Sequence, residues 1–346
     1  MQDLPREAYL GIGTLIGRYC KANSCRDVPQ LKLLLGSLLK KLNVKVTDRK
    51  VENSLIFVLK AIGNAGYVSD ELAAKIVHVA QDKSAPIRLR VAALETYLSD
   101  ACRDKFRDSA LNILKDIQFD SEIRIKAYLA AAECPNGKVA AAVKHLLNDE
   151  PSYQVGGFIS AHLRNLRNSV NPDKAFARAQ LGNIIVVKKY PFDFRKYSFN
   201  LEASNVFDTL GIGNSVEANV IYSQNSFLPR STSLNLTTEV FGHVFNFLQI
   251  DTRQENLDKL LEYYVGPLGV LRTKSGKEIV DYALVKSQEL YMNAKRTLDA
   301  HKGISRHEVR FARSTVTFTF TFQTSATCPR PTSTTSRGNW RGRRTS

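Results

Sequence analysis

The stretches SAPIRLRVAALETYLSD (residues 84–100) and DSEIRIKAYLAAAEC (residues 120–134) carry one pattern twice. Within each, apolar residues recur at i, i+4, i+7 and i+11, which is one face of an α-helix. Each set begins 36 residues after the one before. The residues that repeat are Val51, Leu55, Val58 and Ile62; Ile87, Val91, Leu94 and Leu98; and Ile123, Ala127, Ala130 and Cys134.

A polar residue, Asp48, Ser84 or Asp120, stands three positions before each set and can cap the helix by accepting from a free backbone N–H. Second amphipathic segments follow at residues 72–80, 110–117 and 139–147, and a fourth copy runs from Pro151 to Leu166. Neither helix of such a pair buries its apolar face without the next repeat. We therefore predict an α-helical repeat solenoid, a horseshoe of paired helices; a globular bundle of unrelated helices is the alternative.

After Leu181 the period changes from 3.6 to 2. Apolar and polar residues alternate over residues 197–203, 216–222 and 234–240, and Ile184 to Val187 form an unbroken apolar run that predicts a further strand. Gly242 predicts a bulge or bend. The fold class is therefore α+β, with an antiparallel sheet that has one apolar face. That face either packs on helices or a second sheet, or lines a cavity for an apolar ligand; periodicity does not separate the two.

The chain has 346 residues, enough for two or three domains. We predict a helical-repeat domain over residues 1–178, a sheet over 179–270, a linker or helix over 271–300 and a basic tail over 301–346. The net charge of +16 is uneven, because the tail carries nine Lys and Arg against the single acid Glu308. The tail is either a disordered basic arm that binds polyanions, or the product of an incorrect reading frame.

Signatures of catalysis are missing from the sequence. It contains no Gly-x-Ser-x-Gly elbow, phosphate-binding loop or dinucleotide fingerprint, and its six histidines lie apart from one another. We expect His145 and His162 at helix surfaces, and Asp149 and Glu150 in a solvated turn. The sequence therefore predicts no enzyme and no metal site. Apolar runs fall well short of the roughly 18 residues of a membrane span, and the first residues do not resemble a secretory signal.

Five cysteines are too few for a disulfide framework and lack zinc-ligand spacing. Cys20 and Cys25 are the exception, because the turn between them can bring their Cα atoms to bridging distance. This spacing is compatible with two interpretations: a disulfide between Cys20 and Cys25, or a pair of free thiols.

Several stretches resemble the large lipid transfer protein family, which comprises vitellogenins, apolipoprotein B, the microsomal triglyceride transfer protein and insect apolipophorins. They are LGIGTLIGRYC (10–20) with Cys25, the helix openings Ile87-Arg88 and Ile123-Arg124, FLPRS (227–231), LNLT (234–237) and FG (241–242). The stretch from 130 to 197, with CPNG (134–137) and KKYPFDFRKY (188–197), is most similar to insect apolipophorin. The resemblance covers roughly residues 5–265.

The resemblance implies the later part of a lipid-cavity horseshoe and the sheet that follows it, without the barrel and signal peptide that precede them in the family. It implies lipid binding and transport in a secreted lipoprotein, with bound phospholipid and neutral lipid in place of any cofactor, and with the remaining lipoprotein segments as partners. It favours the Cys20–Cys25 disulfide and makes Asn235 of Asn235-Leu236-Thr237 a candidate glycosylation acceptor. The candidate lipid-lining residues are Phe199, Leu201, Val216, Val220, Tyr222, Leu234 and Leu236.

A second function from a different class stays open. A helical-repeat scaffold could bind a protein or a polyanion on its concave face, without specificity for any nucleic acid. Its contacts would be the basic residues at the helix openings, Arg88, Arg90, Arg124 and Lys126.

Overall fold

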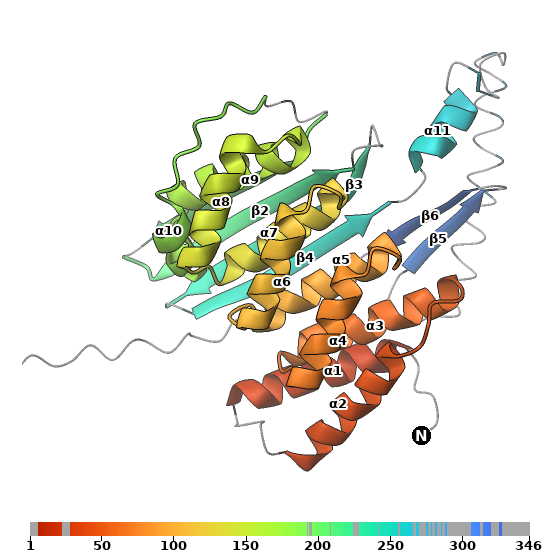
Figure 1. Ribbon diagram of the computed structural model, residues 1–346, viewed down its shortest axis with the longest axis horizontal. Coiled ribbons are helices and arrows are strands. Elements are labelled where there is room, and N and C mark those ends of the chain that lie inside the picture. Colours follow the sequence, from red (N-terminus) through yellow and green to blue (C-terminus); the bar gives the residue numbers. More distant parts are fainter. Residues whose placement is uncertain are drawn as a thin grey trace, which may run out of the picture.

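The computed structural model describes residues 6–22, 28–191, 193, 196–207, 209–223, 228–241, 243–254, 257–265, 268–269, 275, 278, 281, 285, 288, 306–311, 314–319 and 325–326. Figure 1 shows a curved array of helices from α1 to α10, followed by a sheet that lies against the later helices. The α+β fold class predicted from the change of period is confirmed.

The helices alternate between two layers. One layer holds α1 (Arg6–Ala22), α3 (Arg49–Ala65), α5 (Ile87–Tyr97), α7 (Ser121–Glu133) and α9 (Tyr153–Asn168), each in contact with the next. The other holds α2 (Pro29–Leu42), α4 (Asp70–Gln81), α6 (Asp104–Lys115) and α8 (Gly137–Asp149). A continuous apolar core runs between the layers, with Ile62, Leu94 and Ile123 among its most buried residues. The paired-helix solenoid is therefore present as predicted.

Two of the three predicted caps are correct. Asp48 accepts from the N–H groups of Lys50 and Val51, and Asp120 accepts from that of Glu122. Ser84 is not the cap of α5: that helix begins after Pro86, without a side-chain cap bond. The Ser84 N–H and hydroxyl donate instead to Asp82 Oδ1, at 2.8 and 2.6 Å, because this residue closes the preceding turn.

A disulfide joins Cys102 to Cys134, with the Cα atoms 5.1 Å apart and 32 positions of sequence between them. We had predicted no bridge at these residues. Cys102 precedes α6 and Cys134 follows α7, so the repeat itself brings the two ends together although they are far apart in sequence. Cys20 is also disulfide-bonded. Cys25, its predicted partner, lies outside the described residues, so that pairing stays a prediction.

Two short 3-10 helices accompany the α-helices. Within the solenoid, η1 (Leu98–Asp100) follows α5; nearer the sheet, η2 (Pro172–Lys174) precedes α10 (Ala175–Leu181). Residues 184–187, predicted as a strand, form extended coil. Arg167 Nη2 donates to the carbonyl of Ile184, which is buried, while Ile185 and Val187 are 74% and 78% exposed. Ile184 is buried and Val186 is partly buried against the helical core, so the run packs on the solenoid instead of pairing with a strand.

The sheet is antiparallel, in the order β1-β2-β3-β4-β7. Its long strands are β1 (Phe199–Phe207), β2 (Ile212–Tyr222), β3 (Pro229–Val240) and β4 (His243–Arg253). The second and third contain the predicted strands and begin earlier, whereas the first begins two residues later than predicted, at Phe199, and continues to Phe207. The fourth was missed, because we interpreted Gly242 only as a bend. Val240 pairs with His243, so the chain reverses there and returns as β4; Gly242 itself lies outside the described residues.

Further elements follow the sheet. They are α11 (Leu257–Val265), a hairpin of β5 (Arg306–Phe311) and β6 (Ser314–Thr319), and the short strand β7 (Ser325–Ala326), which pairs with β4. The strands β5, β6 and β7 lie within the segment that we predicted as a basic tail, and both interpretations of that tail stay predictions. The domain limits at 178, 270 and 300 stay predictions.

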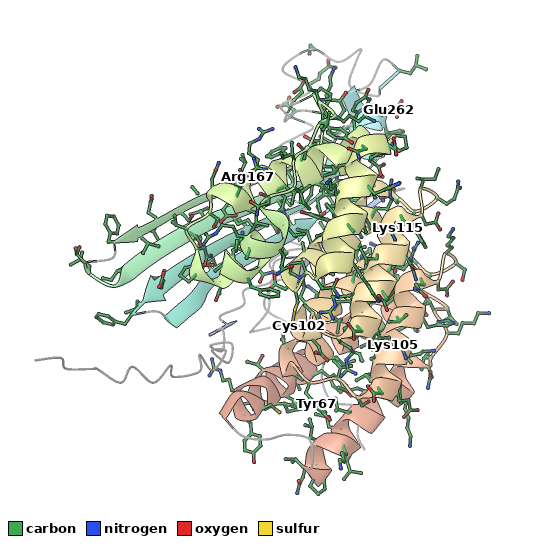
Figure 2. All side chains as sticks on the ribbon, turned by 60° about the vertical axis from the view of Figure 1, so that its left-hand side comes forward. Tyr67, Cys102, Lys105, Lys115, Arg167 and Glu262 are labelled. Atoms are coloured by element: carbon green, nitrogen blue, oxygen red, sulfur yellow. A yellow bond between two sulfur atoms is a disulfide. The ribbon has the colours of Figure 1, made fainter. Side chains whose placement is uncertain are left out.

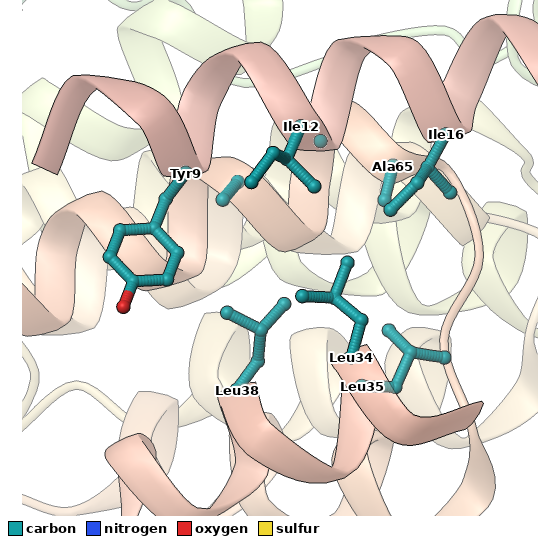
Figure 3. A pocket seen from close by; sticks show the side chains of 9 residues that line it. Tyr9, Ile12, Ile16, Leu34, Leu35, Leu38 and Ala65 are labelled. Carbon is teal, nitrogen blue, oxygen red and sulfur yellow. The ribbon is translucent and has the colours of Figure 1, made fainter. Parts of the chain in front are cut away.

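The solenoid's first layer is held by an unusually close helix contact. A Cβ atom built on Gly13 of α1 would lie 2.3 Å from the carbonyl oxygen of Ala61 in α3, and one on Gly17 would lie 2.3 Å from that of Asn64. Only glycine lets the two helices approach this closely. Beside the contact, Tyr9, Ile16 and Leu38 are among the residues that line a small apolar recess between α1, α2 and α3 (Figure 3).

Candidate functional site

The pairing register divides the sheet into two faces of opposite chemistry. In an antiparallel sheet, directly paired residues point to the same side. Ala203 pairs with Val216, Val216 with Leu236, and Leu236 with Leu248. One side of the sheet therefore carries rows of apolar residues, which we call the apolar face. Its members are Phe199, Leu201, Ala203, Val216, Ala218, Val220, Leu234, Leu236, Leu248 and Ile250.

The opposite side, the polar face, carries rows such as Asn200, Asn219 and Ser233, or Glu202, Glu217 and Asn235. Burial is the reverse of what these chemistries predict in an ordinary sheet. Asn200 is 1% exposed and Asn219 is 6% exposed, whereas Leu201 is 51% and Val216 is 41% exposed. Helices cover the polar face, since α9 and α7 contact β1 and β2 (Figure 1).

On β1 and β2 the polar face is buried with hydrogen-bond partners, because the helices and neighbouring strands supply matching polar groups. Asn165 Nδ2 on α9 donates to the Asn200 carbonyl and to its Oδ1, at 2.8 and 2.7 Å. Asn200 Nδ2 in turn donates to Glu217 Oε1 and Asn219 Oδ1, both at 2.8 Å. A buried polar group with such a partner costs little folding free energy, whereas an unpaired one costs about 1–3 kcal/mol.

Lys174 of η2 is the centre of this layer. Its Nζ lies 2.7 Å from Glu202 Oε2 and 2.6 Å from Glu217 Oε2, so it links β1 to β2. Burial alone would lower the pKa of Lys174, but the carboxylates of Glu217 and Glu202 raise it above its usual value. Burial would raise the pKa of Glu217, and Lys174 lowers it. The cluster therefore stays ionised and joins sheet to helices through charge.

A histidine behind this cluster is also buried. His162 of α9 is 6% exposed, and its Nδ1 lies 2.7 Å from the hydroxyl of Tyr128 on α7. Burial lowers the pKa of His162 to about 4 and raises that of Tyr128. The imidazole is thus neutral, the phenol keeps its proton, and the two share one hydrogen bond. Our expectation of a helix-surface histidine was wrong for His162 and right for His145, which is exposed.

The sheet is also attached to the beginning of α7. Ser121 Oγ donates to the carbonyl of Tyr222 at 2.9 Å, and Ser223 Oγ donates to Asp120 Oδ2 at 2.8 Å. Lys126 Nζ lies 2.9 Å from Glu95 Oε1. Burial, together with the charge of Glu95, raises the pKa of Asp251 on β4. Hydrogen bonds therefore join the sheet to α7 near Tyr222, and Lys126 joins α7 to α5.

Comparisons with known proteins follow this geometry. The family model described as "Vitellogenin TPR domain" matches residues 1–164, and the one described as "Vitellinogen, open beta-sheet" matches residues 196–323. The chain belongs to the large lipid transfer protein family. It is 46% identical to Apolipophorins of Locusta migratoria over 290 residues, 84% of this chain, and 41% identical to Apolipophorins of Manduca sexta over 314 residues, 89% of this chain. It spans 9% of the length of each.

A solved structure concerned with lipid–protein interactions in lipovitellin superimposes with a TM-score of 0.64. It is 27% identical and covers 74% of this chain and 27% of its own. The likeness confirms the order of solenoid and sheet in this member of the large lipid transfer family. The open-sheet match also extends to residue 323, into the tail that we predicted to begin at 301.

The candidate lining residues can now be placed within the family fold. Leu201 and Val216 are exposed on the apolar face, and Phe199, Val220, Leu234 and Leu236 are half-buried there. Tyr222 differs: it is 5% exposed, next to an irregularity of the register between Ile221 and Tyr222. Leu248 and Ile250 complete the face and were missed with β4, although the alternation of Leu248, Gln249, Ile250 and Asp251 was a usable signal. Their lipid contact stays a prediction.

Asn235 lies in the middle of β3, paired with Glu217 on one side and Gln249 on the other, and its Oδ1 is enclosed. Acceptor asparagines are found in surface loops. Position therefore disfavours glycosylation of Asn235 in the folded chain, and the assignment stays untested.

The basic residues of the scaffold hypothesis are internal in the structure. Arg88, Arg90 and Arg124 are 9%, 5% and 2% exposed. Arg124 is paired with Glu150, both side chains being 2% exposed, so Glu150 is not in a solvated turn as we had expected. Lys126 is engaged with Glu95. These residues hold successive repeats together and are not available to a polyanion.

Within the described part of the chain, no group of three or more His, Cys, Asp or Glu residues could hold a metal ion. Among the helices described, none is both long and apolar enough to cross a membrane. The feature with functional potential is therefore the apolar face.

Proposed function

We propose that this chain is a lipid-binding segment of a lipoprotein, in which acyl chains of phospholipid and neutral lipid cover the apolar face. The observation that carries the proposal is the reversal of the sheet: helices cover its polar side and leave Leu201 and Val216 exposed on the other. Removing apolar surface from water releases about 25 cal/mol per Å². No catalytic group is needed for this function, and we propose none.

The comparisons support this function. Apolipophorins and lipovitellin are named among the similar proteins, and the lipovitellin structure concerns lipid–protein interactions. By the same likeness we propose that the chain acts as part of a longer, secreted lipoprotein, with the other segments of that protein as partners.

Lipid extraction and native mass spectrometry of the purified full chain test the proposal. We expect co-purifying phospholipid and neutral lipid in the parent, and a marked loss in Leu236→Glu, which places a charge on the apolar face. Thr237→Glu is the matched control, because the adjacent Thr237 pairs with Ser215 on the polar face. A lipid-free parent, or equal lipid in both variants, would contradict the proposal.

A hydrophobic dye gives a second measurement of the same face. The delipidated parent should enhance dye fluorescence, and added phospholipid should reduce the signal by occupying the face. Leu236→Glu should lower the fluorescence, and Thr237→Glu should leave it nearly unchanged. A parent that does not respond to the dye would mean that the face is covered by protein.

A further inference from the structure

The two hairpin turns at one end of the sheet carry large apolar side chains that protein does not cover. Phe207, Leu210 and Ile212 belong to the β1–β2 hairpin and are 56%, 62% and 43% exposed. Phe241 belongs to the β3–β4 hairpin and is 77% exposed. We call these four residues the apolar tip.

The two turns form one unit. The Phe241 N–H donates to the carbonyl oxygen of Gly211 at 2.6 Å. A Cβ atom built on Gly211 would lie 2.8 Å from Phe241 Cδ1, so the ring of Phe241 lies against the first turn. Figure 2 shows this end of the sheet extending beyond the helices that cover the rest of it.

The backbone of Phe241 is strained. Its φ is 49°, in the left-handed region that costs a bulky side chain on the order of 1–2 kcal/mol and that glycine or asparagine adopts more readily. The side chain of Phe241 is 77% exposed, so its contact with the first turn offsets little of this cost. Strain retained at an exposed aromatic side chain indicates a role in binding rather than in stability.

Part of the tip lies on the same side of the sheet as the apolar face. Phe207 pairs with Ile212, and Ile212 pairs with Val240, so this row lies on the same side of the sheet as Val216 and Leu236. One polar row, Asn205, Asn214 and Thr238, separates the tip from the apolar face, so a molecule that crosses the tip along this side passes a single row before it reaches Val216 and Leu236.

The chemistry of the tip fits a lipid surface better than a protein. Complete coverage of four partly exposed side chains buries a few hundred Å², on the order of half the ~800 Å² per partner of a stable protein interface. Insertion into acyl chains needs no such area or matching shape, because the hydrophobic effect is not directional. Residues 207–212 and 240–243 contain no Lys or Arg, so attraction to anionic headgroups is not the basis of the contact.

We propose that the apolar tip docks the chain on a phospholipid surface by inserting Phe207, Leu210, Ile212 and Phe241 among the acyl chains, and that lipid passes from there to the apolar face. The proposal rests on the proposed function, and adds to it the end of the sheet at which lipid enters.

Flotation of the full chain with phosphatidylcholine vesicles tests the tip. These vesicles are zwitterionic, so the basic charge of the chain does not dominate binding. Phe241→Asn is the informative variant, since asparagine relieves the strained φ and should leave the thermal midpoint unchanged or raised. Val187→Asn is the matched control: Val187 is 78% exposed in extended coil away from the tip.

We expect Phe241→Asn to lower the vesicle partition coefficient about tenfold or more, since burying one phenylalanine contributes more than the ~1.4 kcal/mol of a tenfold change, with Val187→Asn within about twofold of the parent. Leu210→Asn should also lower it. A parent that does not float with the vesicles, tip variants that float like the parent, or an equal loss in Val187→Asn would overturn the proposal.

Uptake of a fluorescent short-chain phosphatidylcholine, kept below its critical micelle concentration, separates this proposal from the proposed function. As a monomer this lipid reaches the apolar face without a docking step. Phe241→Asn should therefore bind it like the parent, whereas Leu236→Glu should not. Uptake by the parent with unchanged flotation of the tip variants would refute the tip alone; no uptake by the parent would refute the lipid-binding function.

Discussion

Arg253 of β4 donates two hydrogen bonds to the carboxylate of Glu122 on α7, over 3.0 and 2.7 Å. Glu122 is fully buried and Arg253 is 14% exposed. Burial would raise the pKa of Glu122, but the Arg253 guanidinium lowers it below its usual value, so the pair is ionised. The pair fastens the end of β4 to the first turn of a helix 131 positions earlier in the sequence.

Arg253→Met should lower the free energy of unfolding by about 3–5 kcal/mol, because it leaves the Glu122 carboxylate buried without its cation. Arg253→Met combined with Glu122→Met removes both charges and should recover most of the loss. Urea unfolding of the three proteins measures both effects. If the double variant were as unstable as the single one, packing rather than the charge pair would hold β4.

Loss of the Cys102–Cys134 disulfide should destabilise the middle of the solenoid. A closed loop of about this length contributes about 3–4 kcal/mol by restricting the unfolded chain. Cys102→Ser combined with Cys134→Ser should show that loss in urea unfolding without reductant. Reductant should then destabilise the parent more than it does the double variant, in which only other disulfides respond. Equal responses would contradict the assignment.

Gly13→Val should loosen α1 from α3, because a Cβ atom at Gly13 meets the Ala61 carbonyl at 2.3 Å. Overpacking of this kind costs about 1–3 kcal/mol. Gly11→Ala is the control on the same helix: nothing lies within 4 Å of its added Cβ, and alanine should stabilise the helix by about 1 kcal/mol. Gly13→Val should therefore raise the protease sensitivity of residues 6–22 and lower the urea midpoint, and Gly11→Ala should have the reverse effect on both.

The stability of the chain should fall on mild acidification through His162. Burial lowers its pKa from 6.5 to about 4, so below pH 6.5 the unfolded chain binds a proton that the folded chain does not. Above pH 6.5 this difference in proton binding does not reduce stability. As the pH falls toward 4, it lowers the free energy of unfolding by up to about 3 kcal/mol.

His162→Gln should remove this dependence, while its side-chain amide still forms a hydrogen bond with Tyr128. Urea midpoints between about pH 7 and about pH 5 test this above the range in which carboxylates titrate. The same slope in parent and variant would assign the pH dependence to another group.

The solenoid could be predicted because the apolar pattern of each repeat lies within a short stretch of sequence. Ile87 and Ile123 are equivalent positions of a local period, and local periodicity survives without knowledge of the tertiary fold. The same logic failed for Ile184 to Val187, where an apolar β-branched run met helices rather than a strand. Local preference is only a weak guide when tertiary contacts decide.

The direction of the sheet could not be predicted. Alternation separates Leu201 from Glu202 into two faces but does not say which one the helices cover. That depends on the contacts of Lys174 and Asn165 with the sheet, which are tertiary contacts that the local sequence pattern does not reveal. Likewise, Arg124 and Glu150 look like surface charges in sequence, and only the contact between successive repeats shows that each neutralises the other inside the core.

The polar layer around Lys174 separates assembly from cargo. In most proteins a sheet is held in place by its apolar face, so a ligand that binds this face competes with the packing of the fold. In this chain, ion pairs and hydrogen bonds on the covered polar face hold the sheet on the helices. Those bonds lie on the covered side. If lipid occupies the opposite side as we propose, we therefore expect the chain to keep one architecture at any degree of loading, so that the amount carried depends on supply rather than on refolding.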